Sequence, residues 1–252
     1  MTNDKKISVC LLTKNNASTI ERCLLAICYE NFVDEVLLLD TGSTDETLEV
    51  AARFPKVRIL QQEGIENFGV TRNFLSSQAK NDWLLHVDSD EFLSPEFFQE
   101  LSELELHSDT VYEISRCMYY RGRPLPGFDD RIMRLYDRTA TSWTNRAVHE
   151  IIHLQEGMKL GRIHSSVKHY SYDSCDRLIQ KAQTYSTLFA DQFAGKRTAS
   201  PWSAVLHGLW AFFRFYFLKR NFLYGYAGFI TSFSFSIMSF LKHAKLYERN
   251  QR

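Results

Sequence analysis

Four short apolar segments, each separated from the next by a stretch with helical spacing, constrain the fold of this chain most strongly. The apolar segments are residues 7–12, 36–39, 57–60 and 83–87. Apolar runs of this length are typical of strands that are buried on both faces of a parallel sheet. The stretches between them, with apolar residues at helical spacing, are residues 18–28, 46–54 and 70–79. Repeated strand–helix units predict an α/β fold with a doubly wound, mostly parallel sheet flanked by helices.

Polar residues stand at the ends of three of these predicted strands. They are Thr13, Asp40 and the group Asp88-Ser89-Asp90. Because the carboxyl ends of parallel strands open onto one crevice, we expect these side chains to face a common site. The glycine-rich GxGxxG turn of a dinucleotide-binding dehydrogenase does not follow the first strand, which disfavours that class of enzyme.

The alternating carboxylates Asp88 and Asp90 are oxygen ligands of the kind that suits Mg²⁺ or Mn²⁺. Such an ion usually completes its coordination with substrate phosphates, so the pair favours a phosphate-bearing substrate. The alternative is that this acidic turn simply caps the helix that begins near Pro95.

The overall composition excludes several function classes. Thirty basic and 30 acidic residues give no net charge, which argues against a nucleic-acid partner. The five cysteines are scattered without a CxxC pair, so neither a zinc ribbon nor a thiol–disulfide site is predicted. The N-terminal residues are polar and lack the apolar stretch of a signal peptide, so we expect a cytosolic protein with reduced thiols.

The pattern changes after residue 110, where residues 111–114 and 131–136 predict further strands, and from Asp173 onward the chain reads as helical. We therefore expect two regions, a catalytic domain over residues 1–172 and a helical region over residues 173–252. Residues 202–252 are rich in aromatic side chains and carry seven Lys or Arg residues against one acid, Glu248.

The strand-end motifs occur in the order and spacing of a known family. The matching segments are Thr13-Lys14-Asn15, Asp40-Thr41-Gly42-Ser43-Thr44-Asp45-Glu46-Thr47, Arg72-Asn73 and Asp88-Ser89-Asp90-Glu91. Over roughly residues 7 to 170 the chain resembles the family 2 inverting glycosyltransferases with the GT-A fold. The resemblance implies a nucleotide-sugar donor, usually a UDP-sugar, and a divalent Mg²⁺ or Mn²⁺ cofactor.

The resemblance also implies roles for individual residues. Thr13 and Asp40 would line the nucleoside pocket, and Arg72 would contact the uracil side or the phosphates. In the donor-binding turn, Asp88 and Ser89 would face ribose and sugar. Many members carry two consecutive acids where this chain has Asp40-Thr41, so the residue that contacts the base is left open.

Metal binding is implied for two further positions, Asp90 and His169. The family often takes another metal ligand from a histidine late in the domain, and His169 is the expected one, although a structural role is the alternative. His86 lies inside a predicted strand, and we expect it to be a core histidine.

Three segments are similar to the bacterial lipopolysaccharide-core β-glucosyltransferases, besides the Asp40–Asp45 variant itself. They are Val148-His149-Glu150, residues 169–172 and residues 222–229. This resemblance implies transfer of glucose from UDP-glucose to a lipid-linked inner-core oligosaccharide. The QxxRW motif of processive synthases is absent, which favours transfer of a single sugar. Two alternatives remain: a soluble transferase that acts on a peptide or small acceptor, and a non-catalytic scaffold that binds partners through its aromatic tail.

An inverting transfer needs a carboxylate base for the acceptor hydroxyl. Glu150 is the predicted base, since its segment forms the acceptor side in this family. Asp129 and Asp130 are the competitors, and a surface salt bridge is the plain alternative for all three.

Residues 221–241 carry no charge, and their large apolar side chains fall on one face of a helix, with Arg214, Lys219 and Arg220 nearby. Aromatic and cationic side chains on such helices predict docking on an anionic bilayer surface rather than a membrane span. We therefore expect a peripheral protein at the cytoplasmic face of the inner membrane. The alternative is that these helices pack on the catalytic domain. The oligomeric state is left open.

Overall fold

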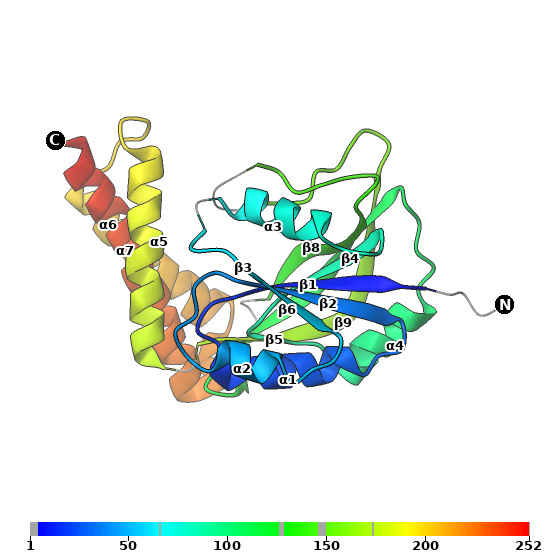
Figure 1. Ribbon diagram of the computed structural model, residues 1–252. Helices are drawn as coiled ribbons and strands as arrows, with labels where there is room; N and C mark the ends of the chain where they lie inside the picture. Colours follow the sequence, from blue (N-terminus) through cyan, green and yellow to red (C-terminus); the bar gives the residue numbers. More distant parts are fainter. Residues whose placement is uncertain (1–4, 66, 126–128, 146–149, 173, 252) are drawn as a thin grey trace. The chain divides into compact units, whose positions relative to one another are not determined.

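The computed structural model describes residues 5–65, 67–125, 129–145, 150–172 and 174–251, and in these ranges nine strands form one sheet (Figure 1). The strand order is β3-β2-β1-β4-β8-β6-β9-β5, with β7 paired to β6. The strands are β1 (Ile7–Thr13), β2 (Val33–Asp40), β3 (Val57–Gln61), β4 (Trp83–Asp88), β5 (Glu91–Phe92), β6 (Thr110–Tyr120), β7 (Arg123–Pro124), β8 (Asp130–Asp137) and β9 (Lys159–Tyr172).

Strands β1 to β4 form the parallel part of the sheet, with β1 between β2 and β4. The register aligns their carboxyl ends, because Thr13 is paired with Asp40 and Leu12 with Asp88. All seven residues of β1 are buried, as its largely apolar sequence predicts. The predicted α/β fold class, with polar residues gathered at one edge of a parallel sheet, is confirmed.

Helices cover both faces of this parallel part (Figure 1). Helices α1 (Ala17–Cys28), α2 (Thr47–Ala51) and α4 (Pro95–Glu103) pack on the face that includes Leu11 and Leu38. Helix α3 (Phe68–Ser77) packs on the opposite face, against Leu12 and Leu39. Neighbouring residues of one strand thus enter two different cores, since successive strand side chains point to opposite faces.

The remaining strands extend the sheet with antiparallel pairs. β8 pairs with the amino-terminal half of β4 and with β6, and β5 pairs with β9 so that Glu91 lies opposite His169. These pairs bring residues from the second half of the chain to the strand ends of the first half.

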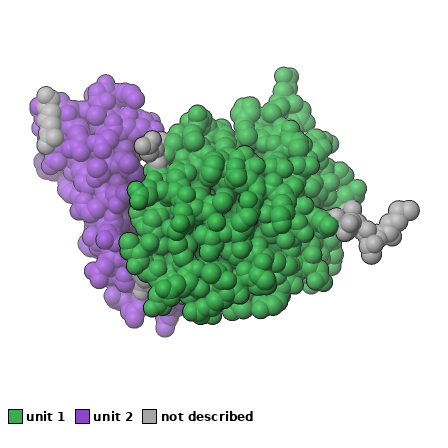
Figure 2. Space-filling model, viewed as in Figure 1, with its two compact units in different colours: residues 1–116, 130–169 green, residues 117–129, 170–252 purple. Residues whose placement is uncertain are grey.

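The chain divides into two compact units, residues 1–116 with 130–169 and residues 117–129 with 170–252 (Figure 2). The second unit holds α5 (Cys175–Phe193), α6 (Pro201–Phe213), a π-helix (Arg214–Leu218), a 3₁₀ helix (Asn221–Tyr224) and α7 (Gly225–Asn250). Its core consists of Tyr120, Leu125, Tyr172, Leu178 and Ala227. That the chain forms independent domains over residues 1–172 and 173–252 stays a prediction.

None of the helices in the described ranges combines the length and the apolar character that crossing a bilayer would require.

Candidate active site

The loops that follow β1 and β2 are joined by hydrogen bonds at the carboxyl edge of the sheet. The Thr13 carbonyl oxygen accepts from both the backbone N–H and the hydroxyl of Thr41. The carboxylate of Asp40, which is buried, accepts from the backbone N–H groups of Gly42 and Ser43 at 3.2 Å and 3.0 Å. Thr13 and Asp40 therefore belong to one hydrogen-bonded corner, and their role in lining a nucleoside pocket stays a prediction.

Asn15 completes this corner. Its side-chain oxygen accepts from the Thr44 backbone N–H at 2.8 Å, while its own N–H donates to the Ser43 hydroxyl. Gly42 has a φ of 101°, a conformation that side-chain-bearing residues rarely adopt. The segment from Asp40 to Asp45 is thus a loop that the hydrogen bonds of Ser43 and Thr44 and the positive φ of Gly42 hold in one conformation.

Arg72 connects two of the predicted site residues. Its Nη2 donates to Asp88 Oδ1 at 2.9 Å, and its Nε donates to Glu150 Oε1 at 3.0 Å. Helix α3 supplies the arginine, the end of β4 supplies Asp88, and Glu150 follows 62 residues later. Arg72 is buried, with 4% of its surface exposed, so in this structure its charge is matched by protein carboxylates.

Two further arginines, which the sequence did not single out, surround the same carboxylates. Arg134 on β8 donates from Nη2 to Asp88 Oδ2 at 2.7 Å. Arg116 on β6 holds Asp130 through two hydrogen bonds of 2.9 Å and 2.6 Å and donates to Glu91 at 3.2 Å. Arg116 Nη1 also lies 3.7 Å from Asp88 Oδ2, so three guanidinium groups and four carboxylates form one continuous ion-pair network.

The network sets the charge states of its members. Burial would raise the pKa of the Asp88 carboxyl, but the charges of Arg134, Arg72 and Arg116 outweigh it and hold that pKa far below its usual range. Glu91 has a raised pKa, because it is fully buried and lies beside the charge of Asp88. Asp88 is therefore a permanent carboxylate, available as a hydrogen-bond acceptor at any physiological pH.

Asp90 and His169, the predicted metal ligands, lie in direct contact. Nε2 of His169 is 3.2 Å from the Asp90 carboxylate. In the described part of the chain, no three His, Cys, Asp or Glu side chains form a ready metal site. The Asp90 carboxylate is nevertheless a ligand of the kind that suits Mn²⁺ or Mg²⁺, and Mg²⁺ often takes only one or two carboxylates and completes its coordination with phosphate oxygens and water.

The other predicted residues have clear positions. Ser89 is buried in the turn after β4, and His86 is fully buried in β4, where a core histidine was expected. Asp130, the competitor of Glu150, is bound by Arg116. Val148 and His149 lie outside the described residues. The roles of these residues toward a substrate stay predictions.

The sequence around Arg134 contains a signal that could have identified this arginine. Arg134 lies inside a predicted strand, between the apolar residues Met133 and Leu135. A charged residue inside such a strand is expected to be paired when it is buried.

Known proteins share this sequence pattern. The model of the family "Glycosyl transferase family 2" matches residues 8–153, which is more than half of the chain. The chain belongs to glycosyl transferase family 2. An uncharacterized glycosyltransferase of Rickettsia felis is 29% identical to this glycosyltransferase over 260 residues, which cover 97% of this chain and 90% of the relative.

A second relative has a more specific description. The lipopolysaccharide core biosynthesis glycosyltransferase LpsC of Rhizobium meliloti is 29% identical over 245 residues, covering 91% of this transferase and 89% of LpsC. Among solved structures, S. aureus TarS 1–349 in complex with UDP is 16% identical, with a TM-score of 0.48 and coverage of 91% and 89% of the two chains. The family assignment and the sheet described above confirm the expected GT-A fold for this transferase.

Proposed function

We propose that this transferase moves a single sugar, glucose, from UDP-glucose to a lipid-linked oligosaccharide of the lipopolysaccharide inner core. The observation that carries the proposal is the direct connection of Asp88, Arg72 and Glu150 at the carboxyl edge of the sheet. It links a donor-binding turn to a carboxylate on the acceptor side. Family membership supports the reaction class, and the similarity to LpsC supports the acceptor class.

In this proposal the nucleoside lies against the corner formed by Thr13 and Asp40. Asp88 accepts hydrogen bonds from hydroxyl groups of ribose and sugar, for which a permanent carboxylate is suited. Arg72 and Arg134 keep the Asp88 carboxylate in one orientation, so the donor meets a preorganised acceptor group. Arg72 acts mainly through Asp88 and Glu150, since its own side chain is buried.

Glu150 takes the proton of the acceptor hydroxyl as that oxygen attacks the anomeric carbon and the bond to the diphosphate breaks. Arg72 engages Oε1, so Oε2 is the oxygen assigned to the proton. The side chain is 14% exposed, which gives an acceptor access to it. Inversion follows from this single displacement, because base and leaving diphosphate lie on opposite faces of the sugar.

Asp90 and His169 would hold a divalent cation on the diphosphate side. Such an ion, when bound, neutralises the charge that develops on the departing diphosphate. A divalent cation would be matched here by excess negative charge, because the four carboxylates of the network and the neighbouring Asp90 together face three arginines.

The helical unit would hold the enzyme on an anionic bilayer, at the cytoplasmic face of the inner membrane. Between Asp191 and Glu248 the sequence has no acidic residue, and it has seven Lys or Arg residues. The same helices expose large apolar side chains, among them Trp202 at 79% and Leu206 and Leu209 at 64% each. Exposed apolar area of this kind marks an interaction surface, and the one-sided charge favours anionic lipid headgroups as the partner.

The test is the release of UDP from a panel of UDP-sugars in the presence of Mn²⁺, with and without purified lipopolysaccharide core acceptor. We expect UDP-glucose to be turned over fastest, and the lipid-linked acceptor to accelerate the reaction. Equal or greater acceleration by a soluble peptide or sugar would favour the alternative soluble transferase. A chain that binds no nucleotide sugar at all would favour the scaffold.

A further inference from the structure

The indole ring of Trp143 lies against both of the arginines that hold Asp88. The guanidinium carbon of Arg72 is 4.9 Å from the ring centre, and that of Arg134 is 5.8 Å from it. Trp143 itself is 4% exposed and lies outside the named strands, in a segment bridged to Ile152. One buried aromatic ring therefore contacts two cations, and each cation donates to a different oxygen of the same carboxylate.

The position of this ring is fixed from two sides. Asn73, the residue next to Arg72, holds the Trp143 backbone at both ends: its Oδ1 accepts from the Trp143 N–H and its Nδ2 donates to the Trp143 carbonyl, each at 2.9 Å. The ring nitrogen Nε1 donates to His86 Nε2 at 3.3 Å. Because an indole N–H can only donate, His86 must be neutral with its proton on Nδ1.

The electrostatics agree with a neutral His86 ring. Burial, together with the charges of Arg72 and Arg134, keeps the pKa of His86 well below its usual value. A neutral His86 adds no further positive charge beneath the two arginines.

Trp143 also lies beside two buried arginine nitrogens that lack a hydrogen-bond acceptor. Nη1 of Arg72 and Nε of Arg134 are buried without a hydrogen-bond acceptor among the described residues. Buried cations with unmatched donors are costly, and the negative face of an indole ring offsets part of this cost. Removing the ring would leave both guanidinium groups free to move away from Asp88.

We propose that Trp143 is a positioning residue of the transferase: by holding Arg72 and Arg134, it sets the orientation of Asp88 toward the donor. The proposal rests on the proposed function, in which Asp88 contacts ribose and sugar. The hydrogen bonds of Asn73 and the contact with His86 place the ring. Within the Arg72-Asn73 pair, Asn73 thus positions the ring that holds Arg72.

The first test compares Trp143→Leu, which removes the aromatic face, with Trp143→Phe, which keeps one. Replacing a partner that orients a site ligand typically costs ~10- to 100-fold in activity or affinity. We expect Trp143→Leu to lower the turnover of UDP-glucose, measured as released UDP, by about this factor. Trp143→Phe should restore turnover to within ~3-fold of the unmodified chain, since it keeps the ring face although it loses the N–H donor.

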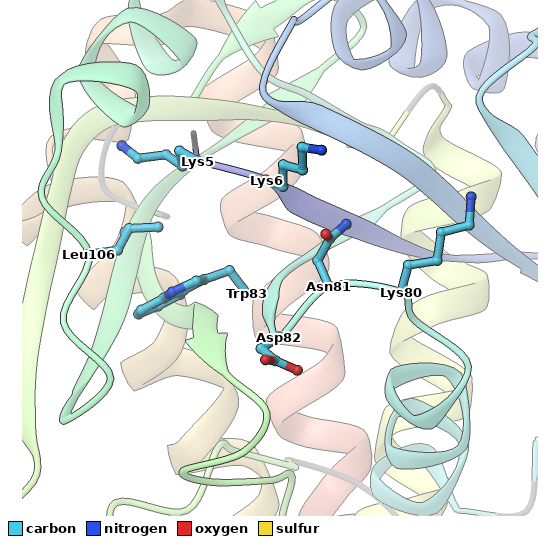
Figure 3. Close-up of a pocket in the computed structure, with 7 residues that line it drawn as sticks. All are labelled: Lys5, Lys6, Lys80, Asn81, Asp82, Trp83 and Leu106. Carbon is cyan, nitrogen blue, oxygen red and sulfur yellow. The ribbon is translucent and has the colours of Figure 1, made fainter. Parts of the chain in front are cut away.

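Trp83→Leu is the matched control. Trp83 is at the amino-terminal end of β4, where it lines a separate pocket with Lys5, Asn81 and Leu106 (Figure 3). Its replacement should lower the thermal unfolding midpoint but leave turnover per folded molecule unchanged.

The deciding experiment is a double-mutant cycle with Asp88→Asn, with folding of every variant checked by its unfolding midpoint. If Trp143 acts through Asp88, Trp143→Leu should cost less than ~3-fold when Asp88 is already replaced. Trp83→Leu should have the same effect in both backgrounds. If Asp88→Asn does not fold, Asp88→Ser replaces it in the cycle, because it also removes the carboxylate that Arg72 and Arg134 hold.

A loss from Trp143→Leu that is equal in both backgrounds, or no loss beyond that of Trp83→Leu, overturns the positioning role while the unmodified enzyme stays active. UDP affinity, measured by titration calorimetry with Mn²⁺, separates this result from a failure of the proposed function. An unmodified chain that neither binds UDP nor releases it overturns the proposed function, and the role of Trp143 with it.

Discussion

Nε2 of His169 lies 3.2 Å from both carboxylate oxygens of Asp90, although 79 residues separate the two in the chain. The contact depends on the antiparallel pair of β5 and β9, which sets His169 opposite Glu91. The two-residue strand β5, directly after the acidic turn, therefore determines which late histidine lies beside Asp90.

This pair predicts a shared metal site. Replacing Asp90 with alanine or His169 with alanine should weaken Mn²⁺-dependent UDP binding by ~10-fold or more, since even the outer-shell partners of metal ligands are typically worth ~10- to 100-fold in metal affinity. Titration calorimetry of UDP with and without Mn²⁺ measures this. His164→Ala is the matched control, because His164 lies on the same strand but is exposed and bound to Glu100. UDP binding by both site variants that still responds fully to Mn²⁺ would remove the metal from these two residues.

Glu150→Gln should abolish sugar transfer with little change in UDP affinity. The glutamine keeps an oxygen that can accept from Arg72 but cannot take a proton, and a positioned base is typically worth ~10²- to 10⁴-fold in rate. Transfer rates and UDP affinity of the same preparation test both halves of this statement. Asp130→Asn is the comparison, and its carboxylate is bound by Arg116. The reverse pattern, with Asp130→Asn inactive and Glu150→Gln active, would transfer the role of base to Asp130.

The parallel part of the fold, and the candidate site residues at its strand ends, could be predicted from the sequence for one reason. Largely apolar runs indicate buried parallel strands. The polar residues that end these runs therefore lie at the carboxyl ends of the strands, at one edge of the sheet. Asp40, Asp88 and Asp90 all follow such runs. Arg116 and Arg134 could not be placed in this way, because they come from antiparallel strands whose pairing partners and register are set by contacts between distant segments. Trp143 lies outside the named strands, where periodicity carries no information.

If the helical unit docks on a membrane, the exposed leucines of α6 should contribute more to vesicle binding than exposed leucines elsewhere. The double replacement Leu206→Ser with Leu209→Ser should reduce binding to vesicles that contain phosphatidylglycerol, since both side chains are largely exposed apolar groups. Binding by the unmodified chain should weaken as salt is raised, because salt screens the attraction of lysine and arginine to anionic lipid. Vesicle co-sedimentation measures both effects. Leu25→Ser, at an exposed leucine of α1, is the control, and an equal loss of binding in it would contradict the assignment.

Two helical glycines of the second unit should respond differently to alanine. A Cβ on Gly228 would overlap the backbone oxygen of Asn221, so Gly228→Ala must displace the 3₁₀ helix before α7 and should destabilise by ~2 kcal/mol or more. A Cβ on Gly208 would lie 3.1 Å from the Phe240 Cβ, a tight contact that is partly offset by the higher helix propensity of alanine, worth ~1 kcal/mol. Thermal unfolding should therefore rank Gly228→Ala well below Gly208→Ala, and equal midpoints would contradict the close approach.

Acid should destabilise the helical unit through a pair of stacked histidines. The rings of His207 and His243 are 3.8 Å apart and nearly parallel, and burial, followed by the charges of His207, Lys242 and Arg197, lowers the pKa of His243 below 6.5. A lowered pKa means that the unfolded chain binds this proton more readily, so the stabilisation is complete above pH 6.5 and is lost as the pH falls below it. Unfolding midpoints between about pH 7 and pH 5 measure this effect, since histidine titrates in this range. His243→Phe keeps a ring beside His207 and should show a weaker decline; an unchanged decline would assign the effect to other groups.

The β5–β9 pair has a consequence for exchanging parts between enzymes of this family. The segment that matches the family model ends at residue 153, sixteen positions before His169. A chimera that received residues 8–153 from this chain would carry Asp90 and Glu150 but would take the histidine partner of Asp90 from its recipient. The predicted metal site would then combine residues from two proteins. It would form only if the late strand of the recipient aligns a histidine with Glu91.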